Sequence, residues 1–485
     1  MPTPLSASAP RTDALPAIKP PRVGLVLTSL MLAAFVCILN ETVLSVALPQ
    51  LMDDFAVTAD VAQWLTTGFL LTMAIVIPTT GFLSARFSRR TLFVSAMIAF
   101  LLGTVLAVLA GSFAAMLVAR VVQALGTAVI MPLLMSTTVA LVAPERRGLM
   151  MGMNAVVISV GPAIGPTLAG LVMYALDWHW VFLLMLPVAA IVLVLGAVAI
   201  RTPHERRAVT LDLPSVALAA VGFGGLVYAL SSASSILRGD VIAIGVGVVG
   251  IAALVLFARR QARRAPSGQA LLDLRPFGVP QFRRAVALAT IAFGVMLGTV
   301  VILPIYFQDG VGLSVLETGV LLLGGGLTQA IAAPIFGRVF DRVGPRPLVI
   351  PGALVMIAAA VALATVTAET PAAVVVTLYV VLSSGIAAVL SSMMTSSMAA
   401  LEPHLFGHGS AIVNTAQQLG GAIGTAGMVA ALTIGGAGAA TAEDSVIAGS
   451  HWAFIIAAAA AAIGAIVALR VRRTASSEAR QGSEV

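Results

Sequence analysis

The sequence is dominated by apolar segments that are long enough to cross a lipid bilayer. A transmembrane helix needs about 20 consecutive apolar residues, and segments of this kind follow one another along the 485 residues. They lie at roughly 23–49, 61–84, 91–110, 113–142, 150–176, 180–200, 214–235, 241–258, 286–308, 317–337, 347–368, 371–400, 410–436 and 451–470. Because lipid offers the backbone no hydrogen-bond partner, each segment must be helical. The sequence therefore predicts an all-α polytopic membrane protein with 14 transmembrane helices.

The composition excludes a soluble protein. Hydrophobic residues make up 59% of the chain and charged residues 10%, whereas soluble domains have about 25% charged residues. The formal charge of +7 would suggest a nucleic-acid partner in a soluble protein. Here the basic residues stand between the apolar segments, so we expect a lipid bilayer and no nucleic acid as a partner. The single cysteine, Cys37, cannot form an internal disulfide.

The basic residues also predict how the chain is oriented. Lys and Arg are retained on the cytoplasmic side of a membrane. With the amino terminus in the cytoplasm, all but two of the 27 basic residues lie in inner loops or tails. The exceptions are Arg238, on the outer side, and Arg120, within a span. We therefore expect a multi-pass protein of the cell (plasma or inner) membrane, with an even number of spans and both termini in the cytoplasm.

An internal repeat divides the chain into halves. At a constant offset of 256, Gly81, Arg86 and Arg90 correspond to Gly337, Arg342 and Arg346. Parallel halves around a site near the bilayer midplane are a recurrent plan of transporters. The predicted divisions are a cytoplasmic tail at 1–22, a six-helix half at 23–200, an inserted helix pair with cytoplasmic linkers at 201–285, a second six-helix half at 286–470 and a tail at 471–485.

Four groups of residues together resemble a known family. They are the first-helix segment 38–49, the loop segments 81–90 and 337–346, the fourth-helix segment 120–126 and the fifth-helix segment 161–170. The chain is similar over nearly its whole length to the fourteen-helix drug:proton antiporter family of the major facilitator superfamily. Within that family it most resembles the lincomycin-resistance-type multidrug exporters.

The resemblance implies the major facilitator fold and proton-coupled secondary active efflux of amphipathic drug-like compounds. Because one fold carries many functions, a carrier of a specific metabolite or lipid, exporting it or taking it up, is the alternative. The resemblance also implies a transporter and not an enzyme, with no catalytic residues. We expect an amphipathic small molecule and protons as partners, and a monomer.

The fifth-helix segment carries two stripes at a spacing of four residues. Gly161, Gly165 and Ala169 form one stripe, which lets another helix approach closely. Pro162, Pro166 and Gly170 form the second stripe, whose prolines remove backbone donors and make the helix prone to bend. On spacing alone, a general packing face is as good an interpretation. The residue pattern of this segment resembles the antiporter motif of the family. That resemblance implies functional roles for Gly161, Pro162, Gly165, Pro166 and Gly170.

Glu41 and Arg120 are the clear charges within the apolar spans. Such charges are costly in hydrocarbon and mark function by default. Counting 1.5 Å per residue places both about 10–12 Å from the outer surface. A carboxylate held between an apolar environment and an arginine can take up and release a proton, so we expect proton coupling here. The alternative is a permanent buried ion pair. The family usually has an Asp where Asn40 stands, and the side chain of Glu41 points about 100° away from that position.

The loop motif departs from the family in its first copy. Its Asp is replaced by Ala85, whereas Asp341 keeps the carboxylate in the second copy. A carboxylate there can meet arginines and helix ends across the cytoplasmic closure, and the first copy cannot. The predicted cytoplasmic gate consists of Gly81, Arg86, Arg90, Gly337, Asp341, Arg342 and Arg346.

Further polar residues within the spans are candidates for a substrate cavity. They are Asn40, Gln123, Thr127, Gln329, Asn414, Gln417 and Gln418. Bonding between neighbouring helices is an equally good interpretation of them. The histidines have no metal-ligand context, so no metal site is expected. No nucleotide-binding GxxxxGK[ST] loop is present. We therefore expect no cofactor, with a proton gradient as the energy source.

Overall fold

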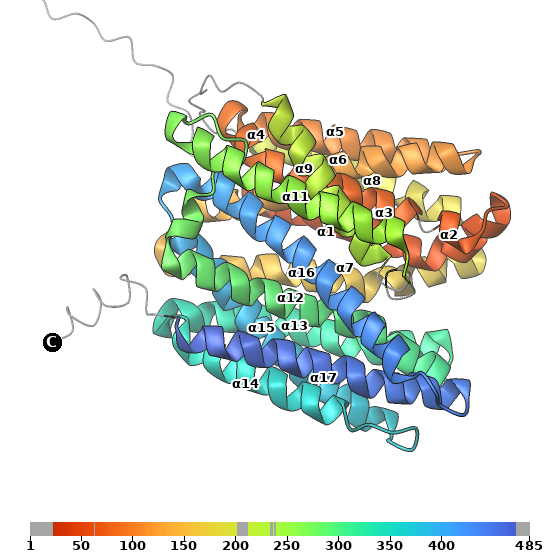
Figure 1. The fold of residues 1–485 in the computed structure, drawn as a ribbon. Helices are drawn as coiled ribbons and strands as arrows, with labels where there is room; N and C mark the ends of the chain where they lie inside the picture. Colours follow the sequence, from red (N-terminus) through yellow and green to blue (C-terminus); the bar gives the residue numbers. More distant parts are fainter. Residues whose placement is uncertain (1–22, 63, 201–211, 233–235, 237–238, 472–485) are drawn as a thin grey trace, which may run out of the picture.

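The chain folds into long helices that run side by side (Figure 1). The computed structural model describes residues 23–62, 64–200, 212–232, 236 and 239–471, and every regular element in them is helical. The helices of the first half are α1 (Val23–Asp54), α2 (Ala59–Ala62), α3 (Trp64–Val76), α4 (Thr80–Arg86), α5 (Arg89–Val108), α6 (Phe113–Leu141), α7 (Arg147–Ala175) and α8 (Trp178–Ala199). Those that follow are α9 (Leu213–Ser231), α11 (Val241–Arg264), α12 (Pro280–Ile305), α13 (Val315–Val343), α14 (Arg346–Leu363), α15 (Ala372–Ala399), α16 (Phe406–Gly435) and α17 (Ala442–Leu469).

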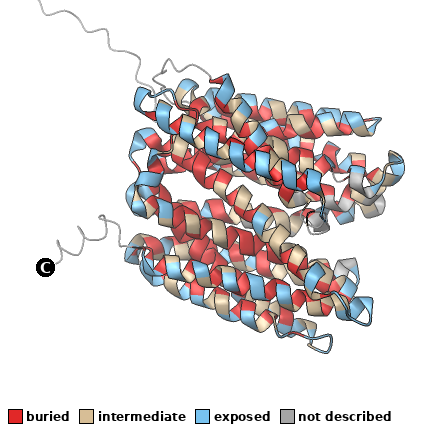
Figure 2. Ribbon diagram, viewed as in Figure 1, coloured by how far each residue is buried: buried red, intermediate tan, exposed pale blue. Residues whose placement is uncertain are grey.

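The described helices are membrane-spanning by length and composition. Thirteen candidate spans are long and apolar enough to cross a bilayer. This number is close to the fourteen expected from the sequence. The 29-residue helix α7 is not among the thirteen, and it packs against α1 and α13. Large apolar side chains cover the periphery, where Figure 2 shows exposed residues on the outer helices. Leu171, Val194 and Ile331 are 62–65% exposed. Exposed apolar surface of this extent fits lipid as the surrounding solvent.

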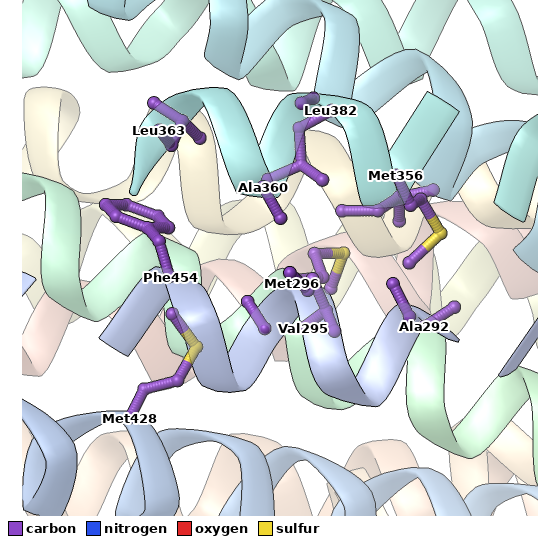
Figure 3. Packing of buried hydrophobic residues seen from close by; sticks show 14 of the residues in the cluster. Ala292, Val295, Met296, Met356, Ala360, Leu363, Leu382, Met428 and Phe454 are labelled. Carbon is purple, nitrogen blue, oxygen red and sulfur yellow. The ribbon is translucent and has the colours of Figure 1, made fainter. Parts of the chain in front are cut away.

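The helices form two bundles, each with its own apolar core. In the first, Leu30, Phe93 and Phe100 are fully buried between α1, α5 and α6. Figure 3 shows the core of the second, where side chains from five helices interdigitate. The labelled residues there are Ala292, Val295, Met296, Met356, Ala360, Leu363, Leu382, Met428 and Phe454. In a further cluster, Phe223 and Phe257 of the inserted helices pack with Phe82 of the first bundle and with Phe282 and Phe406 of the second.

The second membrane pass is broken, unlike its counterpart in the repeat. A 3₁₀ turn at Ile77–Thr79 separates α3 from α4 and contains Pro78, which lacks the backbone donor that a continuous helix needs. The hydroxyl of Thr80 donates to the carbonyl of Ile77 at 2.6 Å across this turn. Pro334 holds the equivalent position in α13, and α13 continues through it as an α-helix.

The inserted helices α9 and α11 pack closely on each other. A side chain on Gly225 would meet the backbone of α11 at Val246 and Gly250. At one end, Asp212 accepts hydrogen bonds from Nε and Nη2 of Arg260 at 2.8 and 2.9 Å. This bidentate contact lowers the pKa of Asp212 to about 2. At the other end, Trp64 of α3 stacks on Tyr228 of α9, with ring centroids 6.2 Å apart. The pair is thus attached to the first half.

The two ends of the bundle differ in charge. The helix ends on one side carry Arg86, Arg90, Arg147, Arg264, Arg283 and Arg346, and those on the other side carry Asp53, Asp177, Asp240, Asp309, Glu317 and Glu443. We name as the basic face the end where α1 begins, with the connections 87–88, 142–146, 265–279, 344–345 and 400–405. We name as the acidic face the opposite end, with the connections 55–58, 109–112, 176–177, 311–314, 364–371 and 436–441. The predicted tails, 1–22 and most of 471–485, lie outside the described residues, as do Arg201, Arg206, Arg207 and Arg238.

The basic face is expected to lie in the cytoplasm, because arginine-rich connections are retained there. A cysteine at Ser267, exposed on the basic face, should resist impermeant maleimides in intact cells and react after permeabilisation. A cysteine at Ala439, exposed on the acidic face, is the matched control and should react in intact cells. Cys37 is fully buried and gives little background. The reverse labelling pattern would overturn this orientation.

Candidate functional site

Arg120 of α6 is fully buried inside the first bundle. Its Nη1 donates to Oε1 of Gln123 at 3.0 Å and to the carbonyl of Asn40 at 3.4 Å, and its Nε donates to the carbonyl of Leu65 at 3.4 Å. The guanidinium carbon lies 4.2 Å from the ring centroid of Phe69. Such a cation–π contact is worth about 2 kcal/mol when desolvated. These contacts offset a burial cost that reaches about 3 kcal/mol on insertion scales.

Asn40 and Gln123 complete this polar cluster. The Asn40 amide donates to Gln123 Oε1 at 3.2 Å, and the Gln123 amide donates to Asn40 Oδ1 at 3.4 Å and to the Thr104 hydroxyl at 3.1 Å. Thr127 donates its hydroxyl to the Gln123 carbonyl at 3.1 Å. Asn40, Gln123 and Thr127 were predicted to line a substrate cavity. Bonding between helices was the equally good interpretation, and in the structure Asn40 and Gln123 form such bonds, whereas Thr127 bonds within α6.

Glu41, one residue further along α1, faces a different region. It lines a central cavity of about 370 Å³ that lies between α3, α9, α12 and α16. Within the described part of the chain Glu41 forms no salt bridge with Arg120, although the two charges interact electrostatically. Nη2 of Arg120 has no hydrogen-bond partner there. The side chains of Asn40 and Glu41 point in different directions because successive residues of a helix are rotated by about 100°. The geometry therefore differs from a permanent contact ion pair.

The central cavity is lined mainly by apolar side chains, with a few polar groups among them. Thr415, Gln418 and Thr425 of α16 supply hydroxyl and amide groups. The inserted helix α9 contributes the apolar side chains of Phe223 and Val227 to the lining. The lining is completed by Leu70, Ala74, Leu230, Leu297, Leu419, Gly421, Ala422, Ala426, Val429 and Ala430. Of the sequence candidates, only Gln418 and Glu41 belong to this lining. An acid beside an apolar wall suits a molecule with a cationic or polar part and an apolar part.

The remaining cavity candidates lie elsewhere. Asn414 lines a void of about 10 Å³ with Met135 and Met394, and its amide donates to the Ser410 carbonyl at 2.9 Å. Gln417 and Gln329 are each 4% exposed, on α16 and α13, and neither lines the central cavity. The void is too small for a substrate.

The fifth-helix stripe of small residues packs against α1 next to Glu41. A side chain on Gly161 would collide with Ile38, and one on Gly165 would collide with the hydroxyl of Thr42. That hydroxyl lies 3.4 Å from the Gly161 carbonyl and 3.1 Å from the Leu39 carbonyl. Ala169 is buried in a cluster with Val43. The first stripe therefore determines how closely α7 approaches the turn of α1 that carries Glu41.

The second stripe does not interrupt the helix. α7 runs as one helix from Arg147 to Ala175 through Pro162 and Pro166. Pro162 is half-buried, and the side chain of Pro166 lies outside the described part. Gly170 is exposed, with open space where a side chain would stand.

The predicted gate residues gather at the basic face. Asp341 of α13 accepts hydrogen bonds from the backbone N–H of Gly148 at 2.7 Å and of Leu149 at 3.0 Å, at the start of α7. Gly337 lies directly against Gly148. In the first copy, Gly81 of α4 lies against His408 of α16. Arg86, Arg90, Arg342 and Arg346 are exposed at this face. A carboxylate on a helix start is favourable because of the helix dipole.

These features fit the fold that the loop motif and the repeat indicated. The sequence profile described as Major Facilitator Superfamily matches residues 30–425. The chain belongs to this superfamily. It is a multi-pass membrane transporter, which sets it apart from enzymes.

Two relatives carry resistance names. The lincomycin resistance protein of Listeria monocytogenes is 36% identical over 457 residues, covering 92% of this chain and 96% of the relative. The multidrug resistance protein B homolog of Mycobacterium tuberculosis is 31% identical over 420 residues, covering 85% of this chain and 77% of the relative. The superfamily's proton:xylose symporter, solved with 6-bromo-6-deoxy-D-glucose, superposes with a TM-score of 0.66 at 17% identity, covering 93% and 96%. That likeness shows the fold alone.

The contact between α7 and α1 should be needed for transport by this superfamily member. Gly165→Leu should abolish transport while the protein still inserts, because the new side chain must displace Thr42. Overpacking of this kind costs about 1–3 kcal/mol. Gly170→Leu is the matched control on the same helix and should transport normally, because nothing lies near that position. The measurement is drug efflux at equal membrane expression. Normal efflux by Gly165→Leu would show that the close approach is dispensable.

Proposed function

We propose that this transporter is a proton-coupled exporter of amphipathic drug-like compounds. The observation that carries the proposal is the position of Glu41, which faces a central cavity with a mainly apolar lining and a few polar groups. Next to Asn40 lies the buried Arg120, whose Nη2 has no hydrogen-bond partner among the residues that the structure describes. Support also comes from the two relatives that are named for lincomycin and multidrug resistance.

The proton and the substrate would compete for the Glu41 carboxylate. A protonated Glu41 is neutral and tolerates the apolar side of the cavity, whereas an ionised Glu41 needs a cation nearby. Arg120 can supply that cation through its free Nη2, and so can a positively charged group on the substrate. Because the carboxylate holds either a proton or a cationic partner, arrival of one favours departure of the other. Because the two cannot occupy the carboxylate together, the transporter would exchange protons for substrate.

Alternating access would be controlled at the two faces of the bundle. In the described structure, helices of the two halves are in contact at the basic face. Asp341 accepts hydrogen bonds from the start of α7, and Gly81 packs against His408. The central cavity lies on the acidic-face side of the void lined by Met135 and Met394. With the basic face in the cytoplasm, this arrangement corresponds to a state from which substrate leaves the cell. Opening of the same contacts would admit substrate from the cytoplasm.

The walls of the central cavity account for the choice of an amphipathic substrate. Phe223 and Val227 of α9 offer apolar contact without directional demands, which suits structurally varied molecules. The hydroxyl and amide groups of α16 fix polar parts. In this proposal the inserted pair is part of the binding site and not only a spacer between halves. The energy source is the proton gradient, and the unit of transport is one chain.

Glu41→Gln should separate binding from coupling. Glutamine keeps the size and hydrogen bonding of the side chain but cannot change charge. Proteoliposomes with an imposed pH gradient should concentrate ethidium or lincomycin when they hold the unaltered protein and should fail with Glu41→Gln. Downhill exchange should persist for at least one compound, which shows that the variant folds.

Asp54→Asn is the control for this experiment. Asp54 is another acid near the acidic face, where it accepts a hydrogen bond from the Trp178 indole at 2.5 Å. Its variant should retain uphill transport. Uphill transport of normal size by Glu41→Gln would contradict the proposal. Flux of a single metabolite or lipid, with no response to the drugs, would favour a specific carrier instead.

A further inference from the structure

The two copies of the loop motif meet the helices across from them in the same way, with one difference. In the second copy, Gly337 lies against Gly148, and Asp341 accepts the N–H groups at the start of α7. In the first copy, a side chain on Gly407 at the start of α16 would meet Ser84 and, at 3.9 Å, the carbonyl of Gly81. Ala85 stands at the position of Asp341. This contact therefore lacks the carboxylate that its counterpart has.

A cavity of about 370 Å³ occupies the place of the missing carboxylate. It is separate from the central cavity and lies at the basic face, between α4, α5, α6 and the starts of α7 and α16. Its lining includes Ala85 and Ser84 on one side and Gly407 on the other. The lining continues to Arg89 and Arg147. The cavity therefore lies between α4 and the start of α16, which are the counterparts of the two elements, α13 and the start of α7, that Asp341 joins in the other half. Arg89 and Arg147 add positive charge to its lining.

Arg89 and Arg147 both have guanidinium N–H groups that are available to bind an acceptor. Arg89 is half-buried and makes no hydrogen bond or ion pair with any residue that the structure describes. Arg147 is half-buried and donates its Nε to the Val142 carbonyl at 3.2 Å, which leaves its Nη groups for another acceptor. A half-buried guanidinium without an acceptor is unfavourable, because burial removes part of its hydration. A bound anion would remove this penalty.

The other charged groups at this cavity do not cancel the arginines. His404 lines it and contacts Glu402 at 3.2 Å, and the Glu402 side chain is 77% exposed. Glu145 is exposed and acts electrostatically on Arg147 from the outside. His408 also lines the cavity and accepts the backbone N–H of Asp273 at 3.2 Å. The described lining itself contains no carboxylate.

We propose that this cavity binds an anion of the phosphate class, either free phosphate or the phosphate of a lipid headgroup with a net negative charge. Arg89 and Arg147 would hold its oxygens through charge-assisted hydrogen bonds, for which guanidinium geometry is well suited. The anion supplies the negative charge that Ala85 does not, at the junction of α4 and α16. One half of the molecule thus closes with its own carboxylate and the other half closes with a ligand.

The experiment measures thermal unfolding of the purified full-length protein by tryptophan fluorescence. In delipidated detergent, sodium phosphate is titrated against sodium chloride of equal ionic strength. In nanodiscs, phosphatidylglycerol is compared with phosphatidylcholine. The unfolding temperature should rise by about 2–4 °C at saturation in at least one arm. Arg89→Gln and Arg147→Gln should each raise the concentration needed by about tenfold, since each removes a charge-assisted bond.

Ala85→Asp is the sharpest variant, because it supplies the carboxylate from the chain itself. It should be as stable without anion as the unaltered protein is with anion, and it should no longer respond. Arg283→Gln removes an exposed arginine from the same face, outside this cavity, and should respond normally.

Each outcome decides the proposal. A response to phosphate in detergent identifies a free anion as ligand, and a response confined to phosphatidylglycerol nanodiscs identifies a lipid headgroup. No response in either arm overturns the proposal. A response that is unchanged in both Arg89→Gln and Arg147→Gln also overturns it, whether or not Ala85→Asp folds.

Discussion

A charged arginine that is buried within a membrane-spanning bundle must find its solvation in the protein, and the first half of this transporter is arranged around that need. Arg120 draws on carbonyl groups of α1 and α3, on Gln123 one turn along α6 and on the ring of Phe69. Three helices are fixed relative to one another by these contacts. With the arginine satisfied in this way, Glu41 is left to face the central cavity, where its charge has no contact partner within the described chain.

Close backbone contacts then connect this charge to the rest of the molecule. Gly165 allows α7 to approach the turn of α1 next to Glu41, and the start of α7 is held by Asp341 of the second half. One helix therefore contacts both the turn beside the acid and the closure at the basic face. Bulky side chains at these glycines would separate the elements, whereas small residues let them slide or part as units. This connection gives a physical route by which protonation and opening can influence each other.

Much of the fold could be predicted from the sequence, because lipid imposes helices and the apolar segments have the required length. The divergence of Asn40 and Glu41 was also predictable from the helical step. The cavity lining was not. Gln418 faces the cavity and Gln417 does not, a distinction that depends on the rotation of α16 against its neighbours. Phe223 and Val227 could not be identified either, since an apolar side chain facing a cavity looks in the sequence like one facing lipid. The two interpretations of Thr127 could not be separated in the sequence either, because a buried hydroxyl can satisfy its own helix.

The central claim is that Glu41 holds either a proton or a cationic substrate. Proton release on substrate binding tests it most directly, with purified protein in weakly buffered detergent and a pH indicator. Saturating ethidium should release protons from the unaltered protein, in an amount that falls as the starting pH rises and Glu41 is already ionised. Glu41→Gln, loaded with the same ligand, should release none. Equal release by both proteins would contradict the account, because another group would then carry the proton.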